Sequence, residues 1–284
     1  MPLRTAEEII SDREKGASEL LEDVFESIRR REEEDMINFL EKLVKRRYSI
    51  TPLVNLSNRI FLSIEKKNDI EKEIDELKQE FYSWKNEAVR EMKRLLERKK
   101  KDKILTLSRS STVIRSLSEV EKVVVLESRP LKEGRVTAKR LMEKGVDVDY
   151  WIDAGMCKAI EEVDCVVVGA DTISIKGFLN KIGSKALAIV SENFGKKFFV
   201  VSDSSKILPK GIPTPKMETH PAKEVWDTQS NISVKNDYFE LTELKRATFI
   251  TEDGIKSSKD IKKIAEGKRV SERLLDIHPS IKER

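Results

Sequence analysis

The sequence predicts an α/β protein in which an N-terminal all-helical domain is followed by a Rossmann-like, doubly wound parallel sheet. Apolar residues recur at the helical intervals of three and four almost throughout residues 6–100. Beyond them, short apolar runs alternate with helical patterns, as in a sheet whose strands are joined by helices. The charged linker 99–103 separates the two patterns, so we assign residues 1–101 to the helical domain and residues 102–284 to the α/β domain.

The helical domain is predicted from apolar stripes whose opposite faces are polar. The longest stripe consists of Ile70, Ile74, Leu77, Phe81, Trp84 and Ala88. Glu, Lys and Asp fill the positions between them, so one face of this helix packs and the other meets water. Another helix is predicted to begin at Thr51, because Pro52 fits the first helical turn.

Six strands are predicted from the apolar runs of the α/β domain. They cover residues 104–107, 123–126, 148–152, 166–168, 198–201 and 248–251. The run 166–168 has no polar alternation, which is typical of a parallel strand covered by helices on both faces. Residues 207–231, rich in Pro, Lys and Thr, are predicted to form a long loop, either functional or mobile. The charged tail from Lys256 onward is predicted to be peripheral.

The composition limits the classes of function. Charged residues make up 37% of the 284 residues, but 55 Lys and Arg nearly balance 51 Asp and Glu. The resulting net charge of +4 gives no reason to expect nucleic-acid binding. The many Lys and Glu, together with few His and Cys, favour a thermophilic source.

Neither a metal, a cofactor nor a membrane segment is expected. Cys157 and Cys165 form no CxxC pair and the chain has 2 His, so a Cys/His metal site is not predicted. The glycine fingerprints of dinucleotide and P-loop sites are absent from the sequence. No apolar run approaches the about 20 residues that cross a bilayer, and the first residues lack a hydrophobic signal segment. We therefore expect a cytoplasmic protein.

The segment 165–185 carries the strongest candidate site. Its strand ends at Gly169, and Asp171 follows at the carboxyl end, where open α/β sheets bind their ligands. Asn180 and Lys181 are predicted to open a helix, and a helix start that carries a lysine can bind an anion. A strand, a capping Asp and a surface Lys would explain the same residues, so both interpretations remain open.

Other polar residues follow the predicted strands and could complete a basic pocket around Asp171. Ser110 and Ser111 either hold a phosphate or cap a helix. Arg129 stands in a stiff turn, where its guanidinium either clamps a phosphate or forms an ion pair at the surface or at a domain interface. Lys206 follows another strand and could join them. Such a pocket would take a phosphorylated ligand, either a sugar or a nucleotide.

Ordered motifs along the chain resemble those of one known family. The run GADTI begins at Gly169 and the run NKIGS begins at Asn180. Together they resemble the family of the alpha, beta and delta subunits of translation initiation factor 2B, which also holds the ribose 1,5-bisphosphate and methylthioribose 1-phosphate isomerases. The further matching segments are residues 15–17, 128–130 with Gly134, 137–138, 153–154, 236–242 and 250–255. The resemblance thus covers residues 6–256.

One residue of the first predicted turn separates the two branches of this family. The resemblance implies that the isomerases carry a cysteine at the position of Ser108, and that this cysteine works with the aspartate at the position of Asp171. A thiol that titrates near neutrality can relay protons between adjacent carbons, whereas a serine hydroxyl without an adjacent base does so poorly. Lys15 stands where the isomerases have an arginine, so charge is kept and fork-like phosphate recognition is lost.

The resemblance therefore implies a non-catalytic regulatory subunit of the initiation factor 2B type. The segment from Ser110 to Val113 resembles the corresponding turn of the regulatory subunits. We expect initiation factor 2 as the partner, through its alpha subunit, and a homo-oligomer of at least two chains. The alternative is an aldose–ketose isomerase of the ribose 1,5-bisphosphate type, with Asp171 as its catalytic residue. A sensor that binds a sugar phosphate or a nucleotide without turnover is the third hypothesis.

Overall fold

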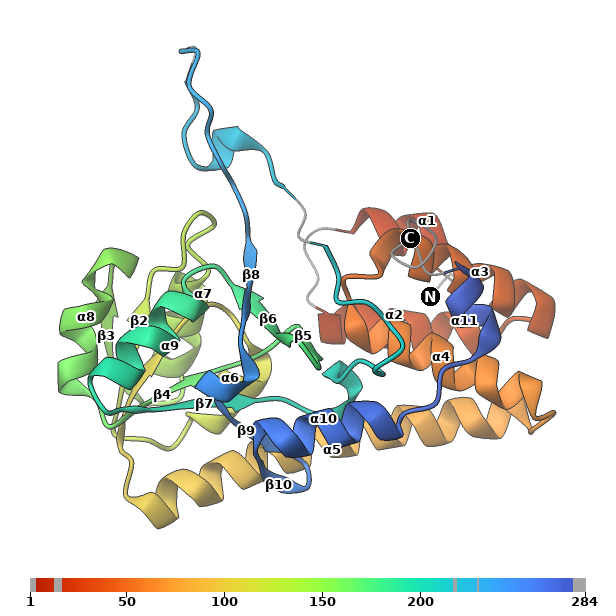
Figure 1. Ribbon diagram of the computed structural model, residues 1–284, viewed down its shortest axis with the longest axis horizontal. Helices are drawn as coiled ribbons and strands as arrows, with labels where there is room; N and C mark the ends of the chain where they lie inside the picture. Colours follow the sequence, from red (N-terminus) through yellow and green to blue (C-terminus); the bar gives the residue numbers. More distant parts are fainter. Residues whose placement is uncertain (1–3, 13–16, 217–218, 229, 278–284) are drawn as a thin grey trace.

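The structure is a computed structural model that describes residues 4–12, 17–216, 219–228 and 230–277. Figure 1 shows a group of helices on one side and a sheet with its covering helices on the other. The long helix α5 (Ile70–Lys99) runs along both groups, so it joins them mechanically. None of the helices in these ranges is long and apolar enough to span a bilayer.

The helical region contains α1 (Ala6–Ser11), α2 (Ala17–Ile28), α3 (Glu33–Arg47), α4 (Thr51–Glu65) and α5. The predicted stripe of α5 is real, because Ile74, Leu77 and Phe81 are buried in the core of this region. Thr5 starts α1 with a capping box, since its side chain accepts from the Glu8 amide and the Glu8 side chain accepts from the Thr5 amide. Pro52 occupies the first turn of α4, as the sequence predicts.

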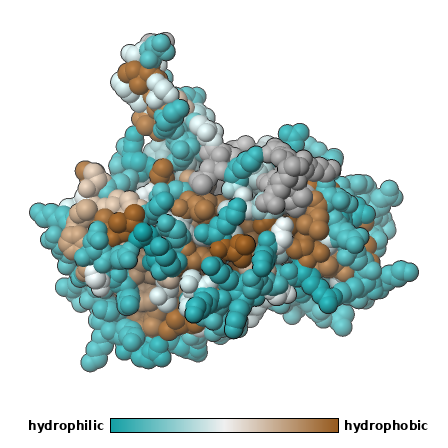
Figure 2. Space-filling view, in the orientation of Figure 1, coloured by the Kyte–Doolittle hydropathy of each residue, from teal (hydrophilic) through white to brown (hydrophobic). Residues whose placement is uncertain are grey.

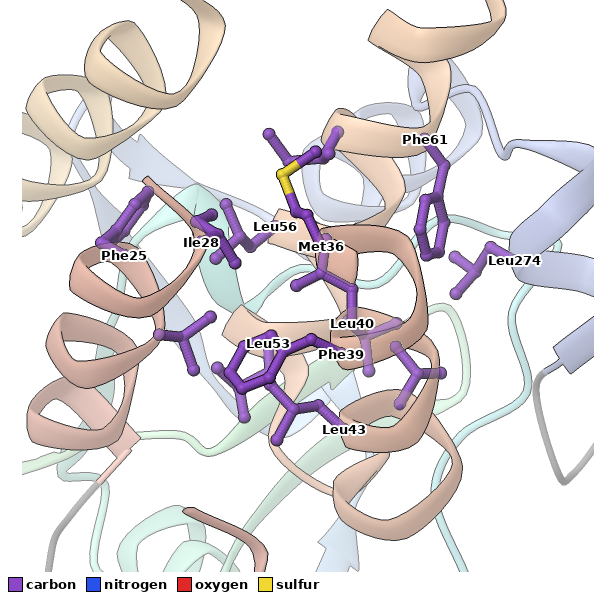
Figure 3. Packing of buried hydrophobic residues seen from close by; sticks show 14 of the residues in the cluster. Phe25, Ile28, Met36, Phe39, Leu40, Leu43, Leu53, Leu56, Phe61 and Leu274 are labelled. Carbon is purple, nitrogen blue, oxygen red and sulfur yellow. The ribbon is translucent and has the colours of Figure 1, made fainter. Parts of the chain in front are cut away.

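The C-terminal tail, expected to be peripheral, contributes to the helical core. Helix α11 (Glu272–Ile277) buries Leu274 and Ile277 there, and Figure 3 shows Leu274 beside Phe61 of α4. The apolar side of this short helix needs a partner, and α3 and α4 offer the apolar surface that covers it. Helix α11 therefore packs with the helical region. The assignment of residues 102–284 to one α/β domain stays a prediction.

The main sheet has 7 strands in the order β10-β9-β7-β4-β1-β2-β3. The six predicted strands all form, as β1 (Lys103–Thr106), β2 (Lys122–Leu126), β3 (Asp147–Trp151), β4 (Cys165–Val168), β7 (Lys197–Val201) and β9 (Thr248–Thr251). These pair in parallel, and β10 (Gly254–Lys256) adds an antiparallel edge. The doubly wound α/β fold is therefore confirmed, with its topological switch point between β1 and β4.

Two apolar cores lie on the two faces of this sheet. One face packs against α5, α6 (Ser111–Ser116) and α7 (Gly134–Met142). The other packs against α8 (Met156–Ala159), α9 (Ser184–Asn193) and α10 (Ser258–Gly267). Neighbouring residues of a strand serve opposite faces, since Ile104 belongs to the first core and Leu105 to the second.

A second, antiparallel sheet was not predicted. It consists of β5 (Thr172–Ser174), β6 (Gly177–Lys181) and β8 (Phe239–Thr242), in the order β5-β6-β8. Asn180 and Lys181, expected to open a helix, instead end strand β6, and α9 begins at Ser184. The helical interpretation was wrong because β6 is held by pairing with β8, a partner far away in the sequence.

The predicted long loop leaves the body of the protein as a projecting arm, visible at the top of Figure 1. We define the arm as residues 219–238. Its two sides meet at an antiparallel bridge between Thr219 and Asp237, and the His220 ring stacks on Tyr238 at 3.4 Å between centroids. Trp226 and Ile232 of the arm are about half exposed. Figure 2 shows hydrophobic patches among hydrophilic ones on this projection.

Gly134→Ala is expected to destabilise the fold strongly, because α7 starts in contact with strand β2. A Cβ at this position would lie 2.0 Å from the Leu126 carbonyl oxygen, which is backbone and cannot yield. We expect a loss near the upper end of the about 1–3 kcal/mol that overpacking costs. Urea unfolding measures the change.

Gly267→Ala is the matched control for this substitution. A Cβ at Gly267 would meet no atom within 4 Å, so its free energy of unfolding should stay within about 0.5 kcal/mol of wild type. Equal stabilities of the two variants would contradict the close contact between α7 and β2.

Candidate functional site

Asp171 lies at the switch point of the sheet, three residues beyond the end of β4. Its backbone amide donates to the Leu179 carbonyl at 2.9 Å, which ties it to strand β6. Burial raises the pKa of the Asp171 carboxyl, the nearby Lys206 and Lys181 oppose this rise, and Glu133 adds to it. The sequence placed an acid at this edge, and the structure surrounds it with two lysines and a second carboxylate.

Lys206 reaches this edge from the turn after β7. Its ammonium donates to the Ala170 carbonyl at 2.6 Å, one residue before Asp171. The turn Ser204–Lys206 is capped by Asp203, whose carboxylate accepts from the Ser205 amide at 3.0 Å. Lys206 is thus fixed beside Asp171 by a local cap and one strong hydrogen bond.

Lys181 approaches from the end of strand β6 and is 1% exposed. Its Nζ lies 2.5 Å from Glu133 Oε2, and 4.7 Å and 5.4 Å from the ring centroids of Tyr238 and Phe239. The charges pair across a short distance, but neither Nζ nor Oε2 takes part in a well-directed hydrogen bond. The charge of the Lys181 ammonium is therefore balanced by Glu133, while its N–H donors lack well-directed acceptors among the described residues.

The start of helix α9 already holds an anion from the protein itself. One carboxylate oxygen of Glu240 accepts from the Gly183 amide at 2.6 Å and from the Lys185 amide at 3.0 Å. Asn180 donates to the Ser184 hydroxyl at 2.9 Å. The amides at this helix start, where an anion was expected to bind, thus hydrogen-bond to the Glu240 carboxylate. Phosphate binding by Asn180 and Lys181 remains a prediction.

The turn after β1 is held tightly by its backbone. Ser108 adopts a φ of 71°, its amide donates to the Ser128 hydroxyl at 2.7 Å, and its carbonyl accepts from Thr137 at 2.7 Å. Ser110 caps helix α6, because its hydroxyl accepts from the Val113 amide at 3.3 Å. The capping alternative therefore accounts for Ser110, while Ser111 is exposed in the first turn of α6.

Gly169 allows the β1 and β4 turns to touch. A Cβ at Gly169 would lie 2.9 Å from the Ser110 hydroxyl oxygen, so a larger residue would push the turns apart. This contact brings the segment around Ser108 next to the segment that carries Asp171. The two strand ends that the resemblance couples chemically are therefore neighbours.

The turn after β2 is held by Asp153, a residue of the matching segment 153–154 for which no role was predicted. Its two carboxylate oxygens accept from the amides of Ser128 and Arg129, each at 2.8 Å. Arg129 is exposed and donates to the Val225 carbonyl of the arm at 3.1 Å. Its guanidinium thus contacts the arm, and phosphate binding by Arg129 remains a prediction.

The helical region contributes to this edge through polar residues of α4. The Thr51 hydroxyl lies 2.6 Å from the Thr172 hydroxyl, next to Asp171. Asn55 donates to the carbonyls of Ser205 and Ile207 at 2.6 Å and 3.0 Å. Polar residues on the apolar face of a helix are the sequence signal for such a contact, which was not predicted.

Two further lysines lie close to these loops, and one expected residue cannot be placed. Burial and the charge of Lys206 lower the pKa of Lys85 on α5. Lys268 donates to the carbonyls of Ser204 and Ile207 at 2.6 Å and 2.7 Å, and burial lowers its pKa to about 8. Lys15 lies outside the described residues. The described ranges hold no cluster of His, Cys, Asp and Glu that could bind a metal ion.

Comparison with known families bears on the whole chain. The model of the initiation factor 2 subunit family matches residues 4–258. The chain belongs to this family. The resemblance drawn from the motifs is thereby confirmed.

Relatives of both functional kinds are similar to this member of the family. A ribose 1,5-bisphosphate isomerase of Archaeoglobus fulgidus is 30% identical over 263 residues, which cover 84% of each chain. A translation initiation factor eIF2B subunit alpha of Dictyostelium discoideum is 41% identical over 85 residues, which cover 30% of this chain and 26% of that one.

Solved structures of both kinds share the fold. A translation initiation factor eIF-2B of Pyrococcus horikoshii has a TM-score of 0.73 and 26% identity, covering 88% of this chain and 94% of its own. A 5-methylthioribose 1-phosphate isomerase of the same organism has a TM-score of 0.71 and 23% identity, covering 93% and 87%. The fold therefore does not separate an isomerase from an initiation factor subunit.

Lys268 should give the protein a rise in stability between about pH 8 and 10.5. Because its pKa falls from 10.5 to about 8 on folding, the unfolded chain binds more protons in this range. The cost of the buried ammonium is then present in full below pH 8 and disappears as the pH rises. Urea unfolding at about pH 7 and about pH 9.5 should show wild type gaining relative to Lys268→Met.

Lys262→Met, an exposed change on helix α10 just before Lys268, controls for the loss of one positive charge. A constant stability difference between wild type and Lys268→Met at both pH values would mean that the ammonium is not desolvated.

Proposed function

We propose that this chain binds a phosphorylated sugar around Asp171 and interconverts its aldose and ketose forms. The Archaeoglobus relative is named a ribose 1,5-bisphosphate isomerase. The observation that carries the proposal is the position of Asp171 at the switch point, with a raised pKa and two lysines beside it. The sequence favoured the regulatory subunit, but the 30% identity over most of both chains supports the isomerase more strongly.

The proposed chemistry uses groups that meet at this edge. An aldose phosphate and its ketose are isomers, so the reaction moves hydrogen between adjacent carbons, as a proton or a hydride, with an acid or base at the oxygens and no external oxidant. A carboxyl whose pKa is raised by burial holds a proton more readily than an ordinary one, and can both take up and return it. Lys206 and Lys181 would attract the phosphate groups as point charges and hold the sugar carbons against Asp171.

A non-catalytic regulatory subunit is the second candidate, and Ser108 is the observation that favours it. The hydrogen bonds found at Ser108 fix its backbone, and the family isomerases are expected to use a thiol at this position. In this case initiation factor 2, through its alpha subunit, is the proposed partner. A homo-oligomer is proposed for both candidates, and a related solved structure is described as a tetrameric complex of beta and delta subunits.

Asp171→Asn should abolish the conversion of ribose 1,5-bisphosphate to ribulose 1,5-bisphosphate. The amide keeps the shape of the side chain and cannot accept the transferred proton, so we expect a loss of about 10²–10⁴-fold in turnover. Asp149→Asn is the matched control, because this half-exposed carboxylate pairs with Lys122 on the sheet edge away from the site.

A coupled assay for the ketose product decides between the candidates. Wild-type turnover that Asp149→Asn keeps and Asp171→Asn loses supports the isomerase. No turnover by wild type, together with retention of initiation factor 2 on the immobilised chain, supports the regulatory subunit instead.

Asp171→Asn should also stabilise the protein at neutral pH. Because folding raises the pKa of Asp171, ionisation of this group destabilises the native state once the pH exceeds the ordinary pKa of 3.8. The Asn side chain removes that cost, so the melting temperature of the variant should exceed that of wild type at pH 7. The advantage should shrink as the pH falls and vanish below 3.8, where Asp171 is protonated in both states. A lower melting temperature of the variant at pH 7 would contradict the desolvation of Asp171.

A further inference from the structure

We propose that Glu133 occupies, in the ligand-free protein, the place of a ligand phosphate at Lys181, and that it releases Lys181 when a phosphorylated ligand binds. This inference rests on the proposed function, because it concerns access to the same site. It makes Glu133 the residue that sets how strongly this site binds anions.

The contacts of Lys181 point to a cation that is prepared for an anion. Its side chain is 1% exposed, and its Nζ lies over the Tyr238 and Phe239 rings at 4.7 Å and 5.4 Å. Buried ammonium groups normally use their donors, yet this Nζ makes no well-directed hydrogen bond to the residues that the structure describes. A phosphate has several oxygens around one centre, so it can meet donors that a single carboxylate oxygen leaves unused.

The two partners differ in their freedom to move. The side chain of Glu133 is 27% exposed, whereas that of Lys181 is 1% exposed. Glu133 also stands immediately before helix α7 and makes no capping hydrogen bond to it. Its carboxylate can therefore turn towards water while the lysine stays, so Glu133 is the member that a ligand displaces.

The charges of the site explain why the displacement matters. Lys181 and Lys206 supply two positive charges, and Asp171 and Glu133 are the two carboxyl groups that act with them. With Glu133 in place, the ammonium of Lys181 is neutralised at 2.5 Å, and a phosphate entering the site meets a negative group. With Glu133 turned away, the same lysine offers a free charge in a site of low dielectric.

Glu133→Gln tests the inference directly, with ribose 1,5-bisphosphate and inorganic phosphate as the probes. The Gln side chain keeps the size and a carbonyl acceptor near Lys181 and removes the competing charge. Isothermal titration calorimetry at neutral pH should show both probes binding about tenfold or more tightly than to wild type. Glu143→Gln removes one exposed charge at the other end of α7 and should bind as wild type does.

Two further variants assign the effect to the contact itself. Lys181→Gln combined with Glu133→Gln should lose the gain, because the cation that receives the phosphate is gone. Glu133→Asp withdraws the carboxylate by one methylene and should give a smaller gain, and it serves in place of Glu133→Gln if that variant does not fold. Circular dichroism and thermal melting establish that each protein titrated is folded.

The outcomes separate this inference from the proposed function. If wild type and both Glu133 variants bind ribose 1,5-bisphosphate equally well, Glu133 does not compete and the inference is wrong, while the proposed function stands. If only the variants bind, the inference is supported and the wild-type isomerase is not. If none of the folded proteins binds either probe, both are overturned.

Discussion

The turn Ser204–Ile207 is the contact on which the rest of the structure depends. Its carbonyls accept from Asn55 of the helical region and from Lys268 after helix α10. The Ser204 amide donates to Glu252 at 3.1 Å. Backbone groups of a buried turn must find partners, and here three distant parts of the chain supply them. The same turn carries Lys206, so the docking of the helices also fixes one charge of the candidate site.

The site combines groups that oppose one another electrostatically. Desolvation favours the neutral form of Asp171, while Lys206 and Lys181 favour its charged form. Such a carboxyl is more responsive to a ligand than one in water, because a small change in neighbouring charge shifts its protonation. Buried Lys181 and partly exposed Glu133 both act on Asp171, so a change in either charge shifts the protonation of this carboxyl.

The arm is connected to the site at its base. Tyr238 lies beneath Lys181, stacks on His220 and donates its hydroxyl proton to the Glu224 carboxylate. Arg129, from the turn after β2, holds the arm through the Val225 carbonyl. The arm is therefore an extension of the strand-end loops, which is where folds of this kind place the residues that vary between functions.

The sequence by itself determined the six parallel strands and the helices that cover them, because apolar runs and helical periods are local signals. It also placed Asp171 at the carboxyl end of a strand, because the apolar run 166–168 stops at Gly169 and Asp171 follows two residues later. These features depend on neighbouring residues alone. The motifs also indicated a family that contains both isomerases and regulatory subunits. Ser108, in place of the cysteine expected in the isomerases, was the reason for favouring a regulatory subunit.

Only the tertiary structure decided which charges meet. Strand β6 exists because it pairs with β8, and Glu240 reaches the start of α9 only through that pairing. Lys181 faces Glu133 because the turn before α7 and the end of β6 converge at one edge of the sheet. Long-range pairing of this kind leaves no periodic trace in the sequence, since each partner satisfies its local pattern without the other.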